Sequence, residues 1–206
     1  EDEEWLASFY HTRESGIDHW LANGAFNGRL FLNVPLSRDT TSSRTNAELQ
    51  HRFALGPQAR LVWGLETRRD EANSVGLFAG GQPPAYELYR AFSNLDWRPT
   101  PGWQLNLGAL VEKNGTAAPQ FVPRAFVNWQ ASATDTFRAG YSRAWQQRNL
   151  FELYGDVRAY DPKGAPGAPP IAWPYAPNPN LRPPHVDTVE LGYLGRFPRL
   201  DATLDV

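Results

Sequence analysis

Apolar and polar residues alternate with period two along nine segments of the chain. In one of them, Trp103, Leu105 and Leu107 alternate with Gln104 and Asn106. Because successive side chains of a β-strand point to opposite faces, each segment predicts a strand with one apolar and one polar face. The nine predicted strands are Glu4–Thr12, Arg44–Leu55, Ala59–Arg69, Tyr86–Trp97, Trp103–Glu112, Arg124–Ala131, Thr136–Gln146, Thr188–Phe197 and Leu200–Val206.

Two environments fit this alternation. In a soluble sheet the apolar side faces a core and the charges face water, whereas in an outer-membrane barrel the apolar side faces lipid and the charges face a wet lumen. Most of the segments have about the length of a tilted transmembrane strand, roughly 9 to 11 residues. Strands of soluble proteins are usually about 5 to 6 residues long, so strand length favours the barrel.

The connections between the strands alternate between short and long. The short ones are residues 56–58, 98–102, 132–135 and 198–199; the long ones are 13–43, 70–85, 113–123 and 147–187. Outer-membrane barrels place short turns on the periplasmic side and long loops outside. We therefore predict an all-β, antiparallel up-and-down meander that is part of such a barrel, with Val189, Leu191 and Tyr193 facing lipid. Within 13–43, the stretch GRLFLNV predicts a small extra hairpin.

Aromatic residues stand near the predicted short turns. Trp97 and Trp103 bracket one turn, Phe197 stands at another, and Trp5 begins a strand. An interfacial girdle would place aromatic side chains at these positions. The alternative is that they are ordinary core aromatics at strand ends, since aromatic residues favour strands in any case.

Composition adds limits to this prediction. The 206 residues include 17 glycines, 18 prolines and 13% aromatic residues, which favours an all-β class. A net charge of -2 and the lack of a basic patch argue against nucleic acid as a partner. Cysteine is absent, which excludes a disulfide framework and thiol catalysis. The first residues do not resemble a signal peptide, so we expect either a soluble protein or a mature or excised piece.

Three stretches resemble one known family. Residues 178–193, NPNLRPPHVDTVELGY, are similar to the segment of TonB-dependent outer-membrane receptors in which a proline-spaced loop leads into a strand carrying Glu-Leu-Gly. Residues 137–155 and 60–71 are similar to earlier strands of the same family, and 121–206 carry most of the match. Two departures stand out, Pro184 in place of the family's usual acid and Gln147-Arg148-Asn149 without its frequent proline.

The resemblance implies a barrel of about 22 strands around a plug. Nine segments fall short of that number, so residues 1–206 are expected to be part of the barrel domain, with the plug and the remaining strands absent from this chain. It also implies the bacterial outer membrane as location, with membrane lipid around the wall. The implied function is uptake of a scarce small molecule, of the siderophore-iron, cobalamin or saccharide class, energised by the TonB complex through the plug.

Catalytic chemistry is not indicated. His11, His19, His51 and His185 are scattered along the sequence. There is no HExxH, no GxSxG and no phosphate-binding loop. We therefore predict that the protein is not an enzyme and has no catalytic residues, no metal site and no cofactor.

The long connection 147–187 contains the candidate ligand-binding residues. It combines aromatic and charged side chains with many glycines and prolines, which limit its conformational freedom. Rigid aromatic side chains offer contact area at low entropic cost, and neighbouring charges select ligand polarity. The predicted binding residues are Tyr154, Arg158, Tyr160, Trp173 and Tyr175. The alternative is that they pack the loop on itself.

A different class of protein also fits part of the pattern. A soluble β-sandwich could recognise a ligand such as a carbohydrate through Trp173 and Tyr175. This alternative predicts that four apolar strand residues pack against a second sheet, whereas the barrel leaves them facing lipid or detergent. These residues are Leu105, Leu107, Val189 and Leu191.

Overall fold

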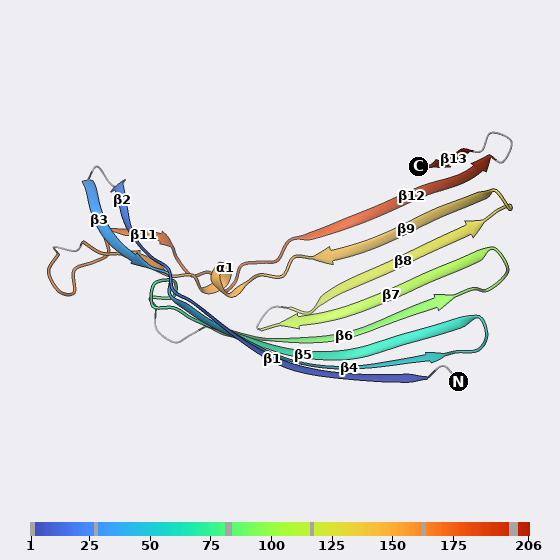
Figure 1. The fold of residues 1–206 in the computed structure, drawn as a ribbon, viewed down its shortest axis with the longest axis horizontal. Coiled ribbons are helices and arrows are strands. Elements are labelled where there is room, and N and C mark those ends of the chain that lie inside the picture. The colour runs from blue at the N-terminus through green and yellow to red at the C-terminus, as the bar shows by residue number, and fades with distance from the viewer. Residues whose placement is uncertain (1–2, 27–28, 81–83, 116–117, 162–163, 198–201) are drawn as a thin grey trace.

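A computed structural model describes the chain except residues 1–2, 27–28, 81–83, 116–117, 162–163 and 198–201. Nine strands form one sheet in the order β1-β4-β5-β6-β7-β8-β9-β12-β13, and every neighbouring pair is antiparallel (Figure 1). The strands are β1 (Glu4–Gly16), β4 (Thr40–Ala54), β5 (Ala59–Asn73), β6 (Ala85–Trp97), β7 (Trp103–Asn114), β8 (Gln120–Gln130), β9 (Asp135–Trp145), β12 (His185–Phe197) and β13 (Ala202–Asp205). The all-β meander is confirmed, and each of the nine predicted segments contributes one strand.

Several strands extend beyond the segments that the apolar pattern marks. Strand β5 continues to Asn73, where its residues Asp70 and Asn73 face Arg44 and Thr41 of β4. Polar residues can continue the strand here, because the hydrogen bonds that pair two strands are made by the backbone. The first residues of the last predicted segment, Leu200 and Asp201, and the turn at 198–199 lie outside the described residues.

Short and long connections lie at opposite ends of the sheet. The turns that join β4 to β5, β6 to β7 and β8 to β9 lie at one end, and the long connections gather at the other (Figure 1). Gly56 and Gly102 adopt positive φ in two of the short turns, a conformation that glycine adopts without strain. The predicted sorting of the loops is therefore present in the structure.

The long connections contain structure of their own. Strands β2 (His19–Phe26) and β3 (Arg29–Ser37) form the predicted extra hairpin. The connection between β9 and β12 contains helix α1 (Leu150–Tyr154) and a second small hairpin, β10 (Val157–Ala159) with β11 (Ala172–Tyr175). Sequence patterns predicted neither α1 nor this second hairpin.

The register of the strands gives the sheet one apolar and one polar face. Leu49, Leu65, Ala91 and Val111 are consecutive partners across β4, β5, β6 and β7, so they form a row on the apolar face. Val189 and Leu191 on the same face are 75% and 81% exposed. The other two sheets have two strands each and lie at the loop end (Figure 1). This arrangement does not match the sandwich alternative, which would bury those side chains against a second sheet.

Aromatic side chains form a row across the turn ends of four strands. Trp103 of β7 stacks on Trp129 of β8 at 5.5 Å between ring centroids, and Trp129 stacks on Phe137 of β9 at 5.6 Å. Tyr193 of β12 continues the row, 5.1 Å from Phe137. Trp103, Trp129 and Phe137 are 40%, 42% and 44% exposed, so they are not core aromatics. A girdle of this kind is typical of the boundary of a barrel's apolar band.

A second aromatic group lies at the turn ends of β1, β4 and β5. The ring of Trp5 stacks on His51 at 3.9 Å, and the indole nitrogen of Trp63 donates a hydrogen bond to His51 Nδ1 at 3.2 Å. His51 therefore belongs to this aromatic row.

Within the described residues, no helix has the length and hydrophobicity needed to cross a membrane.

Candidate functional site

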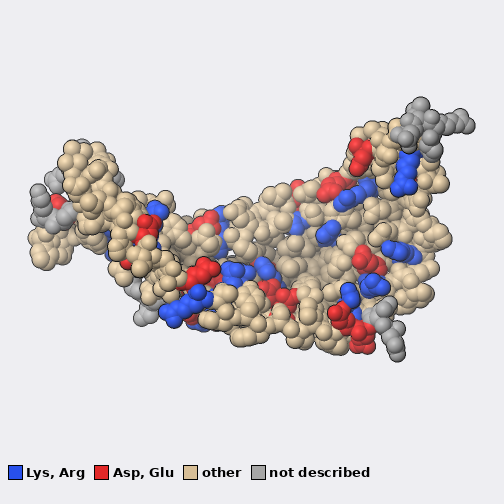
Figure 2. All heavy atoms as spheres, viewed as in Figure 1, with Lys and Arg blue, Asp and Glu red and all other residues tan. Residues whose placement is uncertain are grey.

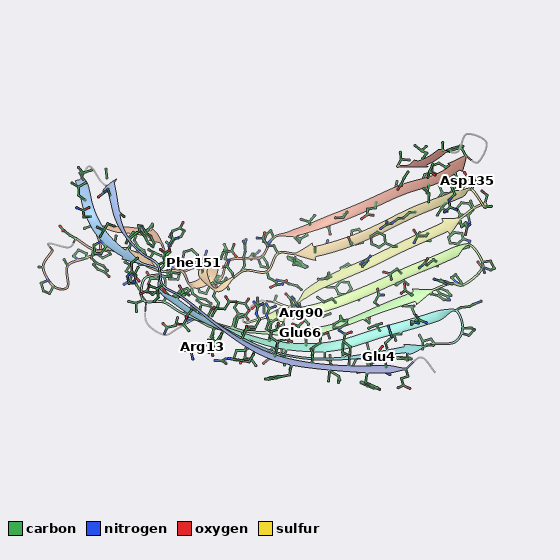
Figure 3. All side chains as sticks on the ribbon, viewed as in Figure 1. Glu4, Arg13, Glu66, Arg90, Asp135 and Phe151 are labelled. Atoms are coloured by element: carbon green, nitrogen blue, oxygen red, sulfur yellow. The ribbon has the colours of Figure 1, made fainter. Side chains whose placement is uncertain are left out.

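Two ion pairs and a hydrogen bond connect four strands on the polar face. Arg90 of β6 lies between Glu66 of β5 and Glu112 of β7; its Nη1 is 3.0 Å from Glu66 Oε2, and its Nε donates to Glu112 (Figure 3). Asn46 of β4 donates to the other oxygen of Glu66 at 2.6 Å. Glu112 is only 3% exposed. Removal of one partner from such a partly desolvated network is destabilising, because it leaves the other charge without compensation.

A second group of ion pairs lies nearer the loop end. Arg44 of β4 makes a two-point contact with Asp70 of β5, at 2.6 Å and 3.2 Å, and Arg68 Nε lies 3.2 Å from the same carboxylate. Toward the other edge of the sheet, on the same polar face, Arg138 of β9 pairs with Glu190 of β12 at 3.2 Å. Figure 2 shows acidic and basic groups side by side along the sheet rather than in patches of one sign. Ion pairs thus join neighbouring strands at both edges of the polar face.

Helix α1 follows β9 after the short connection 146–149 and is fixed by its own cap. The side chain of Asn149 accepts a hydrogen bond from the Glu152 backbone, and the Glu152 side chain accepts one from the Asn149 backbone, which is a capping box. Leu150 is buried. Phe151 packs toward Phe78 at 6.4 Å and Tyr175 at 5.1 Å between ring centroids. The helix therefore contacts both the 74–80 segment and the β10–β11 hairpin.

Asp156 holds the β10–β11 hairpin against the 74–80 segment. Its backbone pairs with both Leu77 and Ala79, at 2.8 Å and 2.9 Å, and it is 2% exposed. The guanidinium of Arg158 donates two hydrogen bonds to the Asp156 carboxylate, at 2.8 Å and 2.7 Å. These hydrogen bonds raise the pKa of Arg158 above its ordinary value because they favour the charged form.

Four of the five predicted binding residues gather on this hairpin. The guanidinium of Arg158 lies 4.7 Å over the ring of Trp173, and Tyr160 interacts with Arg158. Tyr175 packs on α1, and the three aromatic side chains of the hairpin are each about half exposed. Tyr154 does not join them, because it lines a separate cleft with Tyr86 and Gln120. The hairpin aromatics therefore pack on their loop and still offer exposed surface. Lys163, a further charged residue of the connection 147–187, lies outside the described residues.

Sequence reasoning missed the contacts that fix this group. Asp156 and Phe78 have no periodic pattern, and their contact joins segments far apart in the chain. The capping box at Asn149 and Glu152 is a local signal that could have revealed α1. The four histidines contact separate partners, namely Thr45, Asp39, Glu3 and Asp187. Across the described part of the chain, no three His, Asp or Glu side chains cluster as metal ligands.

A single antiparallel meander with one apolar and one ionic face, aromatic rows at its turn ends and long loops at the other end defines a wall segment of a membrane β-barrel. A family model described as TonB dependent receptor-like, beta-barrel matches residues 2–206. The chain belongs to this family, whose members are outer-membrane receptors and transporters rather than enzymes.

Solved structures with the same fold include three receptors. The ferric enterobactin receptor PfeA of Pseudomonas aeruginosa, in a G324V mutant, has a TM-score of 0.67 and 17% identity, with 95% of this chain and 30% of that chain covered. PirA of P. aeruginosa, a siderophore receptor, has a TM-score of 0.65 and 14% identity, with 94% of this chain and 37% of that chain covered. PirA of Acinetobacter baumannii, also a siderophore receptor, has a TM-score of 0.64 and 16% identity, with 95% of this chain and 30% of that chain covered.

These identities are low, so the structures show a shared fold. The chain spans about a third of their length, between 30% and 37%. The search of curated proteins found no match.

Proposed function

We propose that residues 1–206 form part of the wall and the outer loops of an outer-membrane receptor that imports a scarce small molecule with energy from TonB. A plug and further strands would be supplied by sequence outside these residues, since nine strands make less than half of the expected barrel. The TonB complex would act on the plug. The observation that carries the proposal is the nine-stranded sheet with an exposed apolar face and an ion-paired opposite face, in a chain that the family model matches throughout.

The proposed ligand-contacting surface is the β10–β11 hairpin. Tyr160, Trp173 and Tyr175 offer half-exposed aromatic faces. Arg158, held by Asp156, lies over the ring of Trp173, and Tyr175 packs on Phe151 of α1. Fixed aromatic side chains lose little entropy when they bind a ligand. Tyr154 stays a candidate for a separate contact, in the cleft beside Tyr86.

The ligand classes under this proposal are iron–siderophore complexes, cobalamin and saccharides. The structural neighbours include receptors for siderophores and for ferric enterobactin, which favours an iron chelate on analogy of fold alone. Membrane lipid would surround the apolar face. The proposed location is the bacterial outer membrane.

Uptake assays test this function. The complete receptor that contains this chain is produced in a Gram-negative host lacking its own receptors for three radiolabelled probes, ferric enterobactin, cyanocobalamin and maltoheptaose. We expect accumulation of a probe only when TonB is present. Accumulation that persists after TonB is deleted, or no accumulation of any probe above the empty host, would contradict the proposal.

A matched pair of tryptophan variants tests the hairpin. Trp173→Ala removes the aromatic face over Arg158 and is expected to weaken binding of the transported probe about tenfold or more. Trp20→Ala is the control, because Trp20 also lies under an arginine, Arg38 at 4.7 Å, but on the β2–β3 hairpin. Equal loss in both variants would show that the β10–β11 hairpin is not the contact surface.

A further inference from the structure

A groove of ≈600 Å³ lies on the apolar face of the sheet, across β4, β5, β6 and β7. This volume is within the range of about 300–1,000 Å³ typical of small-molecule sites. Two neighbouring rows of strand partners line the groove. The first row is Leu49, Leu65, Ala91 and Val111, and the second consists of Ala47, Thr67, Tyr89 and Lys113.

Small side chains form the floor of the groove. Ala47 and Ala91 extend no further than Cβ. Leu65 and Tyr89, which line the groove with them, are 52% and 51% exposed and project from the face. A depression in a lipid-facing wall forfeits dispersion contacts, because its lining atoms have no partners on one side. A flexible hydrocarbon chain lying in the groove restores these contacts, so we expect an acyl chain there rather than a rigid polar group.

The polarity of the groove rises toward the loop end of the sheet. The first row is entirely apolar, whereas the second row, which lies nearer the long connections, carries the hydroxyls of Thr67 and Tyr89 and the ammonium of Lys113. Because barrels place their long loops outside, this polar end lies at the outer boundary of the apolar band. The groove therefore presents an apolar part and a polar rim in the order in which a membrane lipid presents its acyl chain and its headgroup.

Lys113 is available to an anionic headgroup. It forms no ion pair with any residue in the described part of the chain. Two carboxylates at the loop end of the same face, those of Glu71 and Glu87, are both held by Arg69, at 2.6 Å and 3.1 Å. The hydroxyl of Tyr89 also donates to Glu87 at 2.7 Å. Arg69 with its two carboxylates carries one net negative charge, so the preference for an anionic headgroup is expected to depend on Lys113 and to be moderate.

We propose that this groove binds one acyl chain of a membrane lipid whose headgroup phosphate contacts Lys113. The long lysine side chain keeps its stem on the apolar surface and its ammonium at headgroup level, where lipid phosphates lie. The bound lipid is a ligand of the wall and not the transported molecule, because the groove opens on the face opposite to the ion-paired one. The inference rests on the lipid-facing surface of the proposed function and adds a second, separate binding partner to it.

Native mass spectrometry of the complete receptor, purified in a non-ionic detergent, tests the groove. The probes are dioleoyl phosphatidate, dioleoyl phosphatidylcholine, which has the same chains and no net charge, and inorganic phosphate. Phosphatidate is expected to bind about three- to tenfold more tightly than phosphatidylcholine, the factor that one lysine near an anionic lipid contributes. Lys113→Gln should remove this preference, whereas Lys113→Arg should keep it.

A matched pair of alanine variants tests the floor of the groove. Ala91→Leu fills the depression and is expected to weaken binding of both lipids about threefold or more, because the acyl chain loses its contacts with the wall. Ala109→Leu is the control, since Ala109 lies on the same face in the neighbouring strand β7 and outside the groove lining.

The results separate this inference from the proposed function. A preference for phosphatidate that depends on Lys113, with weaker binding in Ala91→Leu but not in Ala109→Leu, supports the lipid site. A preference that Lys113→Gln leaves unchanged, equal binding in the two alanine variants, or displacement of the lipid by inorganic phosphate overturns it. Uptake of the radiolabelled probes decides the proposed function independently: if TonB-dependent import persists while lipid binding ignores these substitutions, the inference fails and the proposed function stands.

Discussion

The substitution Leu107→Arg places a charge in the middle of the apolar face. Leu107 lies in β7, four residues after Trp103 of the aromatic row and six residues before Lys113. At about 3.4 Å per residue and a tilt of about 40°, these separations correspond to depths of roughly 10 Å and 15 Å. The two boundaries thus enclose a band of about 25 Å, the height expected for the lipid-facing surface of a barrel.

An arginine at this depth is expected to cost about 2 to 4 kcal/mol of folding free energy, which is roughly a 30-fold to several-hundred-fold change in the folding equilibrium. On the opposite face, Asn106 donates a hydrogen bond to Asp96 at 2.7 Å. Asn106→Arg would bring a guanidinium to that carboxylate. Because an exposed ion pair contributes about 0 to 1 kcal/mol, this second variant should be nearly neutral.

The assay is urea unfolding of the complete receptor folded into phospholipid vesicles, with a constant m-value as the check on two-state behaviour. Val111→Arg provides a depth control, because Val111 is on the apolar face but only two residues from Lys113. If this face contacts lipid, Val111→Arg should cost only about 0 to 1 kcal/mol of folding free energy, because position 111 lies near the boundary of the apolar band. Equal losses in Leu107→Arg and Asn106→Arg, or a loss at Val111 as large as at Leu107, would refute the assignment of the faces.

Three further predictions follow from individual contacts. Arg90→Met leaves the carboxylates of Glu66 and Glu112 without their shared partner and should cost about 1 to 3 kcal/mol in the same urea assay, a value reduced for the partial exposure of Arg90. Gly140→Ala should cost about 1 to 3 kcal/mol of folding free energy, because a Cβ there would lie 2.1 Å from the Phe126 ring. The guanidinium groups of Arg124 and Arg138 lie over this ring at 4.9 Å and 5.0 Å and restrict its movement. The hydrogen bond from His19 lowers the pKa of Asp39 below its ordinary value of 3.8. The ionised Asp39 carboxylate therefore stabilises the β2–β3 hairpin above pH 3.8, and this stabilisation is lost as the pH falls through the lowered pKa. Amide hydrogen exchange across β2 and β3 measures the loss.

Each of these predictions has its own control. Arg90→Lys keeps a positive charge and should recover part of the stability that Arg90→Met loses; no recovery would mean that the charge is not what matters. Gly108→Ala meets its nearest atom, Asn94 Oδ1, at 3.2 Å and should cost less than Gly140→Ala. An Asp39→Asn variant should lose the acid transition of the hairpin, and an unchanged transition would exclude Asp39 as its cause.

The sequence predicts the sheet well because the sheet depends on a repeated local pattern. The alternation around Leu107 and around Leu191 marks both the strands and their apolar face, and loop length alone sorts the two ends of the sheet. Strand ends were less accurate, since residues such as Asp70 continue the ladder after the apolar pattern has ended.

The candidate site could be predicted only in part. Arg158 and Trp173 were identified from their side-chain chemistry, but their contact depends on Asp156, whose partners in the 74–80 segment lie far away in the chain. A pocket beside α1 is lined by Thr12, Ser42 and Asp70 from three strands, and each of these residues appears in the sequence as an ordinary strand residue. Contacts of this kind are set by tertiary pairing, which a single sequence does not display.

The orientation of β12 is the most direct test of the account. Residues 1–206 contain no cysteine, so within them each single substitution at consecutive positions from Thr188 to Tyr193 introduces one site for a nitroxide label. Electron paramagnetic resonance in vesicles then compares collisions with oxygen, which concentrates in lipid, and with a water-soluble nickel chelate. The account predicts high oxygen accessibility for labels at Leu191→Cys and Val189→Cys and high nickel accessibility at Glu190→Cys. Uniform accessibility along the strand, or the opposite alternation, would contradict it.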